Sequence, residues 1–340
     1  MLDATRLRVL VAIARHGSVT AAAQALNYAQ PSISHHMARL ESETGAKLME
    51  RSGRGIRLTD AGRLLAERAE EILGRLEAAE AELAAHVGLK QDTVRLAAFG
   101  SALGTLAAAA GAALRADGAM ADMSLVQAEP ADALRMLRVG EVDVALVFRY
   151  QAHADLDGTG PAGQALPGTD DPLHDPDLHY HPVLDEPVYL LTPVARSARP
   201  PEPRPADGTA APAGGGSGRS ILADYAAHRW IAGCERCQDV LVRLCRSAGF
   251  SPDIAVTTDD YVATQALVAA GLGTAILPGL ALQGLRQPGV ATTELPGTRR
   301  QVLAATYGGP PERAAASALL AALGRAAARY GADQADARST

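Results

Sequence analysis

Residues 18–57 constrain the fold more than any other stretch, because they combine two short helical patterns with a tight turn and a basic loop. An alanine-rich helical pattern precedes a turn at Asn27-Tyr28, and a second helical pattern opens at Gln30-Pro31. Proline is well tolerated at the first position of a helix, because its missing N–H would have no partner there. Two helices joined by a turn of about three to four residues form the helix-turn-helix plan. The sequence therefore predicts a helix-turn-helix, supported by a preceding helix at residues 3–16.

The second helical pattern separates an apolar face from a polar one. Ile33, Met37 and Leu40 recur at i, i+4 and i+7 and form the face that we expect to be buried. Small polar and basic side chains lie off this face: Ser32, Ser34, His35 and Arg39. Such side chains can hydrogen-bond base edges in the major groove of DNA, which is wide enough to admit a helix. The pattern therefore favours a helix that reads double-stranded DNA.

A basic loop with two glycines follows at residues 50–58, between apolar flanks, and is typical of a short β-hairpin, or wing. Arg51 and Arg54 are expected to contact phosphates, which give affinity and salt dependence but little sequence information. A solvated charged turn is the alternative. Ser18 or Thr20 is expected to cap the helix before the turn, and the same hydroxyl can also meet a phosphate.

A long amphipathic helix is predicted from residue 59 to about residue 87. Its apolar residues recur at alternating spacings of four and three, which is a heptad seam: Leu65, Ala69, Ile72, Leu76, Ala79 and Leu83. At about 1.5 Å per residue the helix is on the order of 40 Å long and needs a partner along its seam. A second chain can supply this partner; packing against its own chain is the alternative.

Charge is distributed unevenly along the 340 residues. Residues 1–60 carry a formal charge of +3, whereas the whole chain carries −6 and the remainder therefore −9. A basic head on an acidic body predicts DNA contact at one end of the molecule. Only two of the 32 basic residues are Lys. Arg is the better bidentate donor to phosphate and guanine, although genome composition explains the same bias.

The remainder of the chain alternates strand-like and helical segments, which predicts an α/β fold with parallel pairing. Strands are expected at residues 94–99, 123–128, 144–148, 183–193, 230–232, 254–257, 274–278 and 301–307. Helices are expected at residues 102–115, 130–139, 221–227, 234–248, 258–270 and 314–330. Residues 88–92 are predicted to form a hinge, residues 151–179 and 196–219 long loops, and the last ten residues a polar tail.

The N-terminal part of the chain resembles the LysR-type transcriptional regulators, with the order and spacing of the matching residues intact. The residues that carry the resemblance are Gly17, Ser18, Ala22, Ala23, Leu26, Gln30, Pro31, Ser32, Ser34, Leu40, Glu41, Gly45, Leu48, Arg51, Thr59 and Gly62. Three later segments extend the resemblance over most of the chain: GEVDVALVF at 140–148, AGFSPDI at 248–254 and VAAGLGTAILP at 268–278.

The resemblance implies an α/β multidomain protein: an N-terminal winged helix-turn-helix at residues 1–58, a linker and dimerisation helix at 59–90, and a C-terminal two-lobed effector domain of periplasmic-binding-protein type at 91–332. Lobe I would comprise about 91–182 and 291–332, and lobe II about 183–290. The function implied is a sequence-specific transcriptional regulator that binds promoter or operator DNA as a homodimer or tetramer. A small-molecule effector between the lobes would set its activity.

The DNA-binding residues expected on this basis are Ser18, Thr20, Gln30, Pro31, Ser32, Ser34, His35, Arg39, Arg51 and Arg54. Gln30, Ser34 and His35 would contact bases, with Pro31 packing beside them. Position 35 often carries Gln or Arg in the resembling family, so the His here leaves base preference and pH response at this position open.

Effector-binding residues are expected where strands end and helices begin, because ligands of α/β folds gather there. The candidates are Gly100, Ser101, Phe148, Arg149, Gly233, Cys234, Thr257 and Thr258. Hydroxyls and helix N-termini suit an anionic or polar ligand; ordinary helix capping is the alternative.

The pair Cys234 and Cys237 opens a predicted helix, where the helix N-terminus and Arg236 can lower a thiol pKa. A redox sensor is therefore one hypothesis, and half of a zinc site another. No second such pair exists, and Cys245 lies further along the same helix, so zinc is not expected. The third interpretation is a pair of small polar residues in a ligand-facing loop.

Other chemistries lack support in the sequence. No Walker A, GxSxG, HExxH or strand-linked GxGxxG motif occurs, so neither an enzyme nor a cofactor is expected. The irregular spacing of His153, His174, His179 and His181 does not favour a metal site. Three cysteines, no apolar run of membrane length and no signal peptide predict a cytoplasmic location. A small-molecule binding protein without DNA function is a further alternative, but it leaves residues 18–57 and the heptad seam unexplained.

Overall fold

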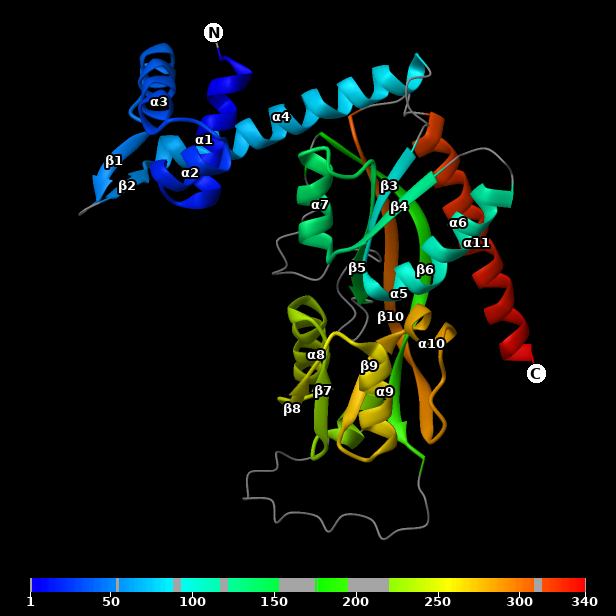
Figure 1. The fold of residues 1–340 in the computed structure, drawn as a ribbon. Helices are drawn as coiled ribbons and strands as arrows, with labels where there is room; N and C mark the ends of the chain where they lie inside the picture. The colour runs from blue at the N-terminus through cyan, green and yellow to red at the C-terminus, as the bar shows by residue number, and fades with distance from the viewer. Residues whose placement is uncertain are drawn as a thin grey trace, which may run out of the picture.

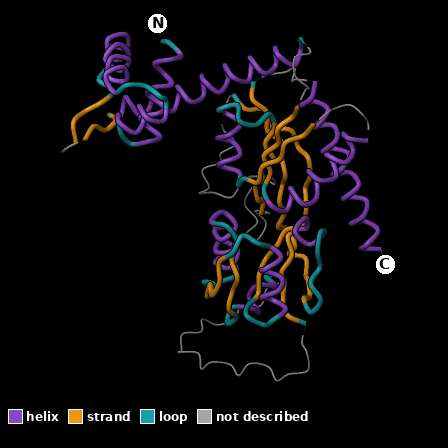
Figure 2. Tube along the Cα trace, in the orientation of Figure 1, coloured by secondary structure: helices purple, strands orange, loops and turns teal. Residues whose placement is uncertain are grey.

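The computed structural model describes residues 2–52, 55–87, 93–116, 122–152, 175, 177–194, 220–308 and 314–339. A small helical head lies at one end of a long helix, and an elongated two-lobed body lies at the other (Figure 1). Strands form the interior of the body and helices cover it (Figure 2). No helix in the described residues is long and apolar enough to cross a membrane.

The head contains three helices and a hairpin: α1 (Ala4–His16), α2 (Val19–Ala25), α3 (Gln30–Thr44), β1 (Met49–Ser52) and β2 (Gly55–Leu58). Ile33, Met37 and Leu40 of α3 are fully buried, as their spacing predicts. The helix ends follow local rules, since Gly17 and Gly45 end α1 and α3 with left-handed φ angles of 71° and 67°. The predicted helix-turn-helix is therefore present, with a β-hairpin after it.

The long helix α4 (Asp60–His86) leaves the head and crosses to the body (Figure 1). Its predicted seam is covered by the head along the first turns and exposed further along. Ala69 is fully buried and Leu65 is half-buried against the core of the head, so these two residues pack on their own chain and not on a partner. They do so because α1 lies along this side of α4. Ile72, Leu76 and Leu83 are 47%, 40% and 64% exposed, so this part of the seam has no apolar cover within the described residues.

The body contains one eight-stranded sheet with the order β4-β3-β5-β10-β6-β9-β7-β8. Its strands are β3 (Thr93–Ala98), β4 (Asp122–Gln127), β5 (Val144–Ala152), β6 (Leu178–Pro193), β7 (Arg229–Ala232), β8 (Asp253–Thr257), β9 (Thr274–Pro278) and β10 (Val290–Tyr307). β3 pairs in parallel with β4 and β5, and β7 with β8 and β9, as predicted. The long strands β6 and β10 are antiparallel and run through both lobes, which they join (Figure 1).

The helices of the body are α5 (Gly100–Ala102), a π-helical turn (Leu103–Ala107), α6 (Ala108–Ala116), α7 (Pro130–Arg138), a 3₁₀ turn (Ile221–Tyr225), α8 (Glu235–Ser247), α9 (Tyr261–Ala269), α10 (Gly279–Gln283) and α11 (Ala314–Ser339). Three differences from the sequence predictions stand out. Gly100 and Ser101 begin a helix two residues before the predicted start at 102, α10 was not predicted, and the expected polar tail continues α11. Most of the predicted loops at 151–179 and 196–219, and the predicted hinge, lie outside the described residues.

The predicted strand at 301–307 is much too short, since β10 begins at Val290. A Pro-Gly pair in the middle of β10 is the reason, because Pro and Gly usually interrupt a strand. Gly297 adopts a left-handed φ of 71°, and the pairing of β10 with β6 shifts register between Glu294 and Arg299. The pair therefore marks an irregularity inside one strand, at the level where the chain passes between the lobes.

Candidate functional site

The outer face of α3 presents most of the residues predicted to contact DNA. Gln30, Pro31, Ser32, Ser34, His35 and Arg39 are all exposed. They are exposed because Ile33, Met37 and Leu40 hold the opposite face in the core. Arg39 forms an ion pair with Glu43 one turn later, at 3.5 Å. An exposed polar helix face on a firmly buried helix is the geometry that a major-groove reader requires.

The remaining predicted contacts lie on α2 and the wing. Ser18 caps α2, since its Oγ accepts the Ala21 N–H at 3.1 Å, while Thr20 is exposed within the helix. Arg51 is exposed on β1 and forms no ion pair with a described residue, whereas Arg54 lies outside the described residues. The sequence did not indicate a role for His36, which lies next to His35 and stacks on Tyr28 with ring centroids 5.9 Å apart.

Glu41 fixes the wing to α3. Its carboxylate accepts N–H groups from Leu48 and Met49 at 2.8 and 3.2 Å and pairs with Lys47 at 3.1 Å. Partial burial raises the pKa of this carboxyl, but the hydrogen bonds and Lys47 outweigh burial and leave it below its ordinary value. The hairpin is therefore held at a fixed angle to α3, so both can face one ligand.

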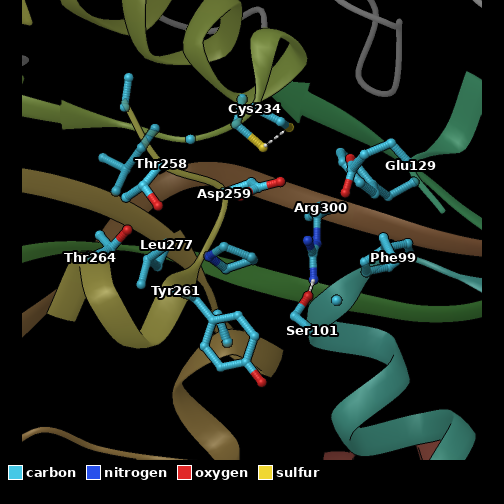
Figure 3. A pocket seen from close by; sticks show the side chains of 18 of the residues that line it. Phe99, Ser101, Glu129, Cys234, Thr258, Asp259, Tyr261, Thr264, Leu277 and Arg300 are labelled. Atoms are coloured by element: carbon cyan, nitrogen blue, oxygen red, sulfur yellow. Dashed lines mark hydrogen bonds between the residues drawn. The ribbon is translucent and has the colours of Figure 1, made fainter. Parts of the chain in front are cut away.

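A second candidate site is the pocket between the two lobes (Figure 3). Its water-accessible volume is about 80 Å³, several times the roughly 10–15 Å³ that one water needs, so a small molecule fits. Six of the eight predicted effector residues line it: Gly100, Ser101, Phe148, Gly233, Cys234 and Thr258. They come from both lobes, so a ligand here would touch both.

Two predicted effector residues do not line the pocket, because side chains alternate along a strand. Arg149 lies between Phe148 and Tyr150 on β5, and its Nε donates to Gln301 at 2.7 Å. Tyr150 lines the pocket instead. At the end of β8, Thr257 is exposed and Thr258 faces the pocket. The end of β8 was therefore located correctly, whereas β5 continues to Ala152, four residues past its predicted end.

Arg300 of β10 is the most strongly held pocket residue, and the sequence did not indicate it. Only 3% of its side chain is exposed, and Glu186, its partner across β6, is fully buried. Arg300 donates to Glu186 at 2.6 Å and to Ser101 Oγ at 3.0 Å, and it lies over Phe99 and Phe148. Glu186 also accepts the Leu280 N–H at the start of α10, at 2.5 Å. This ion pair thus ties elements of both lobes together.

The two pocket cysteines lie side by side, with 3.0 Å between their sulfur atoms. The Cys234 thiol donates to Cys237, and this bond lowers the pKa of Cys237 while burial raises it; Arg300 and Tyr150 lower it further, and the net direction is down. The pKa of Cys234 is raised, by its bond to Cys237 and by burial. Cys237 therefore loses its proton more readily than Cys234.

Glu129 faces these thiols from lobe I, at the N-terminal end of α7 (Figure 3). Burial raises the pKa of its carboxyl; Asp259 raises it as well, while Cys234 lowers it. No group of three or more potential metal-ligating side chains occurs within the described ranges. His153 and His174 fall outside those ranges, and His181 hydrogen-bonds Thr306 on β10.

Comparison with known proteins places both candidate sites in one family. Residues 4–63 match the model of the bacterial regulatory helix-turn-helix protein, LysR family, and residues 168–328 match the LysR substrate binding domain. The chain belongs to the LysR-type transcriptional regulator family.

Several relatives support this assignment. A probable cat1 operon transcriptional activator from Acinetobacter lwoffii is 34% identical over 45% of this chain, and the match spans only half of that relative's length. The regulator TcbR from Pseudomonas sp. (strain P51) is 27% identical over 88% of this chain and 90% of its own. Full-length CbnR in complex with its target DNA shares the fold, with a TM-score of 0.59, 21% identity and coverage of 96% of this chain and all of CbnR.

Proposed function

We propose that this chain is a sequence-specific DNA-binding transcriptional regulator whose activity is set by a small molecule bound between its lobes. The strongest support for the proposal is the exposed polar face of α3. The buried apolar face of α3 fixes its position, and the wing lies beside it. CbnR, which has the same fold, has been solved with its target DNA. The division at residues 58 and 90, the DNA-contacting residues and the cytoplasmic location belong to this proposal.

The regulator acts as a dimer, assembled through the exposed residues of α4 and able to form a tetramer. The effector site comprises the six lining residues predicted from the sequence, together with Tyr150 and Arg300. Because the lining comes from both lobes, ligand binding favours one arrangement of the lobes over another. A ligand shifts such an equilibrium only through its different affinity for the two states.

The DNA-contact assignment predicts that two substitutions have different signatures. Gln30→Ala should cost about 1–3 kcal/mol on the preferred operator and relax specificity at one base pair, because a base contact is lost. Arg51→Ala should weaken binding to all sequences alike and reduce the slope of log K against log salt by about 0.9, because one phosphate contact is lost. Fluorescence anisotropy at several salt concentrations measures both, with the distant exposed Arg246→Ala as the control. An unchanged slope in Arg51→Ala would remove the wing from the contact surface.

A thiol redox-sensing regulator of the same fold is the second candidate. The 3.0 Å separation of the Cys234 and Cys237 sulfurs favours it, since the disulfide bond length is about 2.05 Å. Hydrogen peroxide would convert the two thiols into a disulfide and two waters. Peroxide-dependent DNA binding that is lost in Cys234→Ser and kept in Cys245→Ser would support this candidate. Cys245 is a suitable control because burial raises its pKa to about 12. DNA binding that is indifferent to peroxide would exclude it.

A further inference from the structure

The helix α7 joins the effector pocket to the linker helix. Its N-terminal end carries Glu129, which lines the pocket and faces Cys234 of lobe II. Its C-terminal end, about 14 Å away at 1.5 Å per residue, contacts the middle of α4. Ala133, Leu134 and Leu137 bury its inner face against the sheet, so α7 moves as part of lobe I.

Arg75 of α4 holds the C-terminal end of α7. Its Nε donates to the Arg138 carbonyl oxygen at 3.0 Å, and its Nη2 donates to the Leu137 carbonyl oxygen. The last carbonyl groups of a helix have no partner within the helix and carry partial negative charge, so a guanidinium satisfies them well. Arg75 also lies over the ring of Tyr307 at the end of β10, 3.3 Å from its centroid. One side chain thus binds both α7 and the strand that crosses between the lobes.

Two glycines let the backbone of α4 approach the C-terminal end of α7 where Arg75 binds it, a contact between residues 74–75 and 137–140 that we call the Arg75 joint. A Cβ on Gly74 would overlap the Val139 carbonyl oxygen just beyond α7. Gly140 adopts a left-handed φ of 69°, and a Cβ there would lie 2.8 Å from the Gly74 carbonyl oxygen. Any larger residue at either position would separate α4 from α7. The contact is therefore close and specific to this pair of segments.

The space beside the joint is open. A cavity of about 360 Å³ lies between the head, α4 and lobe I, and its lining includes Arg8, Leu26, Leu73, Val139 and Glu141. A space therefore separates part of the head from lobe I beside this contact.

We infer that α7 and the Arg75 joint transmit the state of the effector pocket to the linker helix, and so to the spacing of the two DNA-reading heads. This inference rests on the proposed effector site. An occupant that changes the contact between Glu129 and lobe II would reorient lobe I, and the joint would impose that change on α4. Without the joint, the pocket and the linker helix would respond independently.

The test uses a fixed occupant, because the natural effector is unidentified. N-ethylmaleimide is attached to Cys234 in the full-length Cys237→Ser protein. The remaining cysteine, Cys245, is fully buried and should not react. The Cys234 thiol adds across the maleimide double bond, so no leaving group is released. Thr258→Trp provides a second, genetic occupant of the same pocket. Hydrogen exchange of α7 and of residues 70–79 is then compared with and without the occupant. The backgrounds are the unsubstituted protein, Arg75→Met, Arg75→Lys and Arg68→Met. Arg68 is an exposed arginine of α4 that forms an ion pair with Glu71.

The occupant should change exchange in both α7 and residues 70–79 of the parent and of Arg68→Met, by roughly 2- to 30-fold. In Arg75→Met the change should persist in α7 and disappear from α4. Arg75→Lys keeps the charge but lacks the planar fork that binds both carbonyl oxygens, so it should behave similarly. An equal response of α4 in the Arg75 variants would overturn the inference, as would a parent in which α4 or α7 does not respond. The readout needs no DNA, so a failure of DNA binding would reject the proposed function separately.

Discussion

Ile72→Glu combined with Leu76→Glu should convert the protein to a monomer and weaken operator binding by roughly 10²–10⁴-fold, the loss expected when two linked contacts become one. These side chains are 47% and 40% exposed on α4, although both are large and apolar. A second α4 would bury them, and a carboxylate cannot be buried there without a cation. Each half-site would then bind one head alone.

Sedimentation velocity and DNA anisotropy measure this result directly. The matched control is Leu272→Glu with Leu285→Glu, which makes the same change in charge at apolar residues that are 48% and 40% exposed on lobe II. The control should remain dimeric and bind DNA like the parent. A dimer that survives both glutamates on α4 would place the dimer interface elsewhere.

Arg300→Met should destabilise the body by about 3–5 kcal/mol, because it leaves the fully buried Glu186 carboxylate without its cation. Adding Glu186→Gln should recover most of this loss, since the amide oxygen can still accept the Leu280 N–H and no charge remains. The loss in Arg300→Met should shrink as the pH falls. Burial raises the pKa of Glu186, and without the opposing effect of Arg300 the carboxyl takes up a proton more readily in the folded state.

Urea unfolding at several pH values tests this prediction. The neighbouring pair supplies the control: Arg299 donates to Asp185 at 2.5 Å on the same two strands, but both side chains are substantially exposed. Arg299→Met should therefore cost only about 0–1 kcal/mol. Equal effects of the two substitutions would mean that the Arg300 pair is not sealed from solvent.

The DNA-binding head was predictable because its determinants are local. The spacing of Ile33, Met37 and Leu40, the proline at the start of α3 and the glycine after it each act within a few residues. The apolar seam of α4 was predictable as a pattern, but not its division between two partners. Whether Ala69 meets its own α1 or a second copy depends on how the head packs, which helical periodicity does not encode.

The pocket was predictable only in outline. The ends of β3 and β8 and the start of α8 could be located to within about one residue, whereas β5 extends past its predicted end. Six of the expected residues meet at the pocket. Arg300 could not be identified, because Pro296-Gly297 argues against a strand and the predicted strand therefore began only at residue 301. Nothing local distinguishes Arg300 from Arg299, since only the pairing of β10 with β6 turns one side chain inward. Tyr150 was missed because β5 extends past its predicted end, and Glu129 because it precedes a helix rather than following directly on a strand.

A salt titration tests whether the protein binds DNA sequence-selectively. The full-length protein is titrated onto labelled DNA from immediately upstream of its own coding region and onto a shuffled duplex of equal length and composition. We predict tighter binding to the upstream DNA at every salt concentration, and log K values that fall linearly with log salt because phosphate contacts release counterions. Equal affinity for the two duplexes across a range of candidate promoters would show that the protein does not select a DNA sequence.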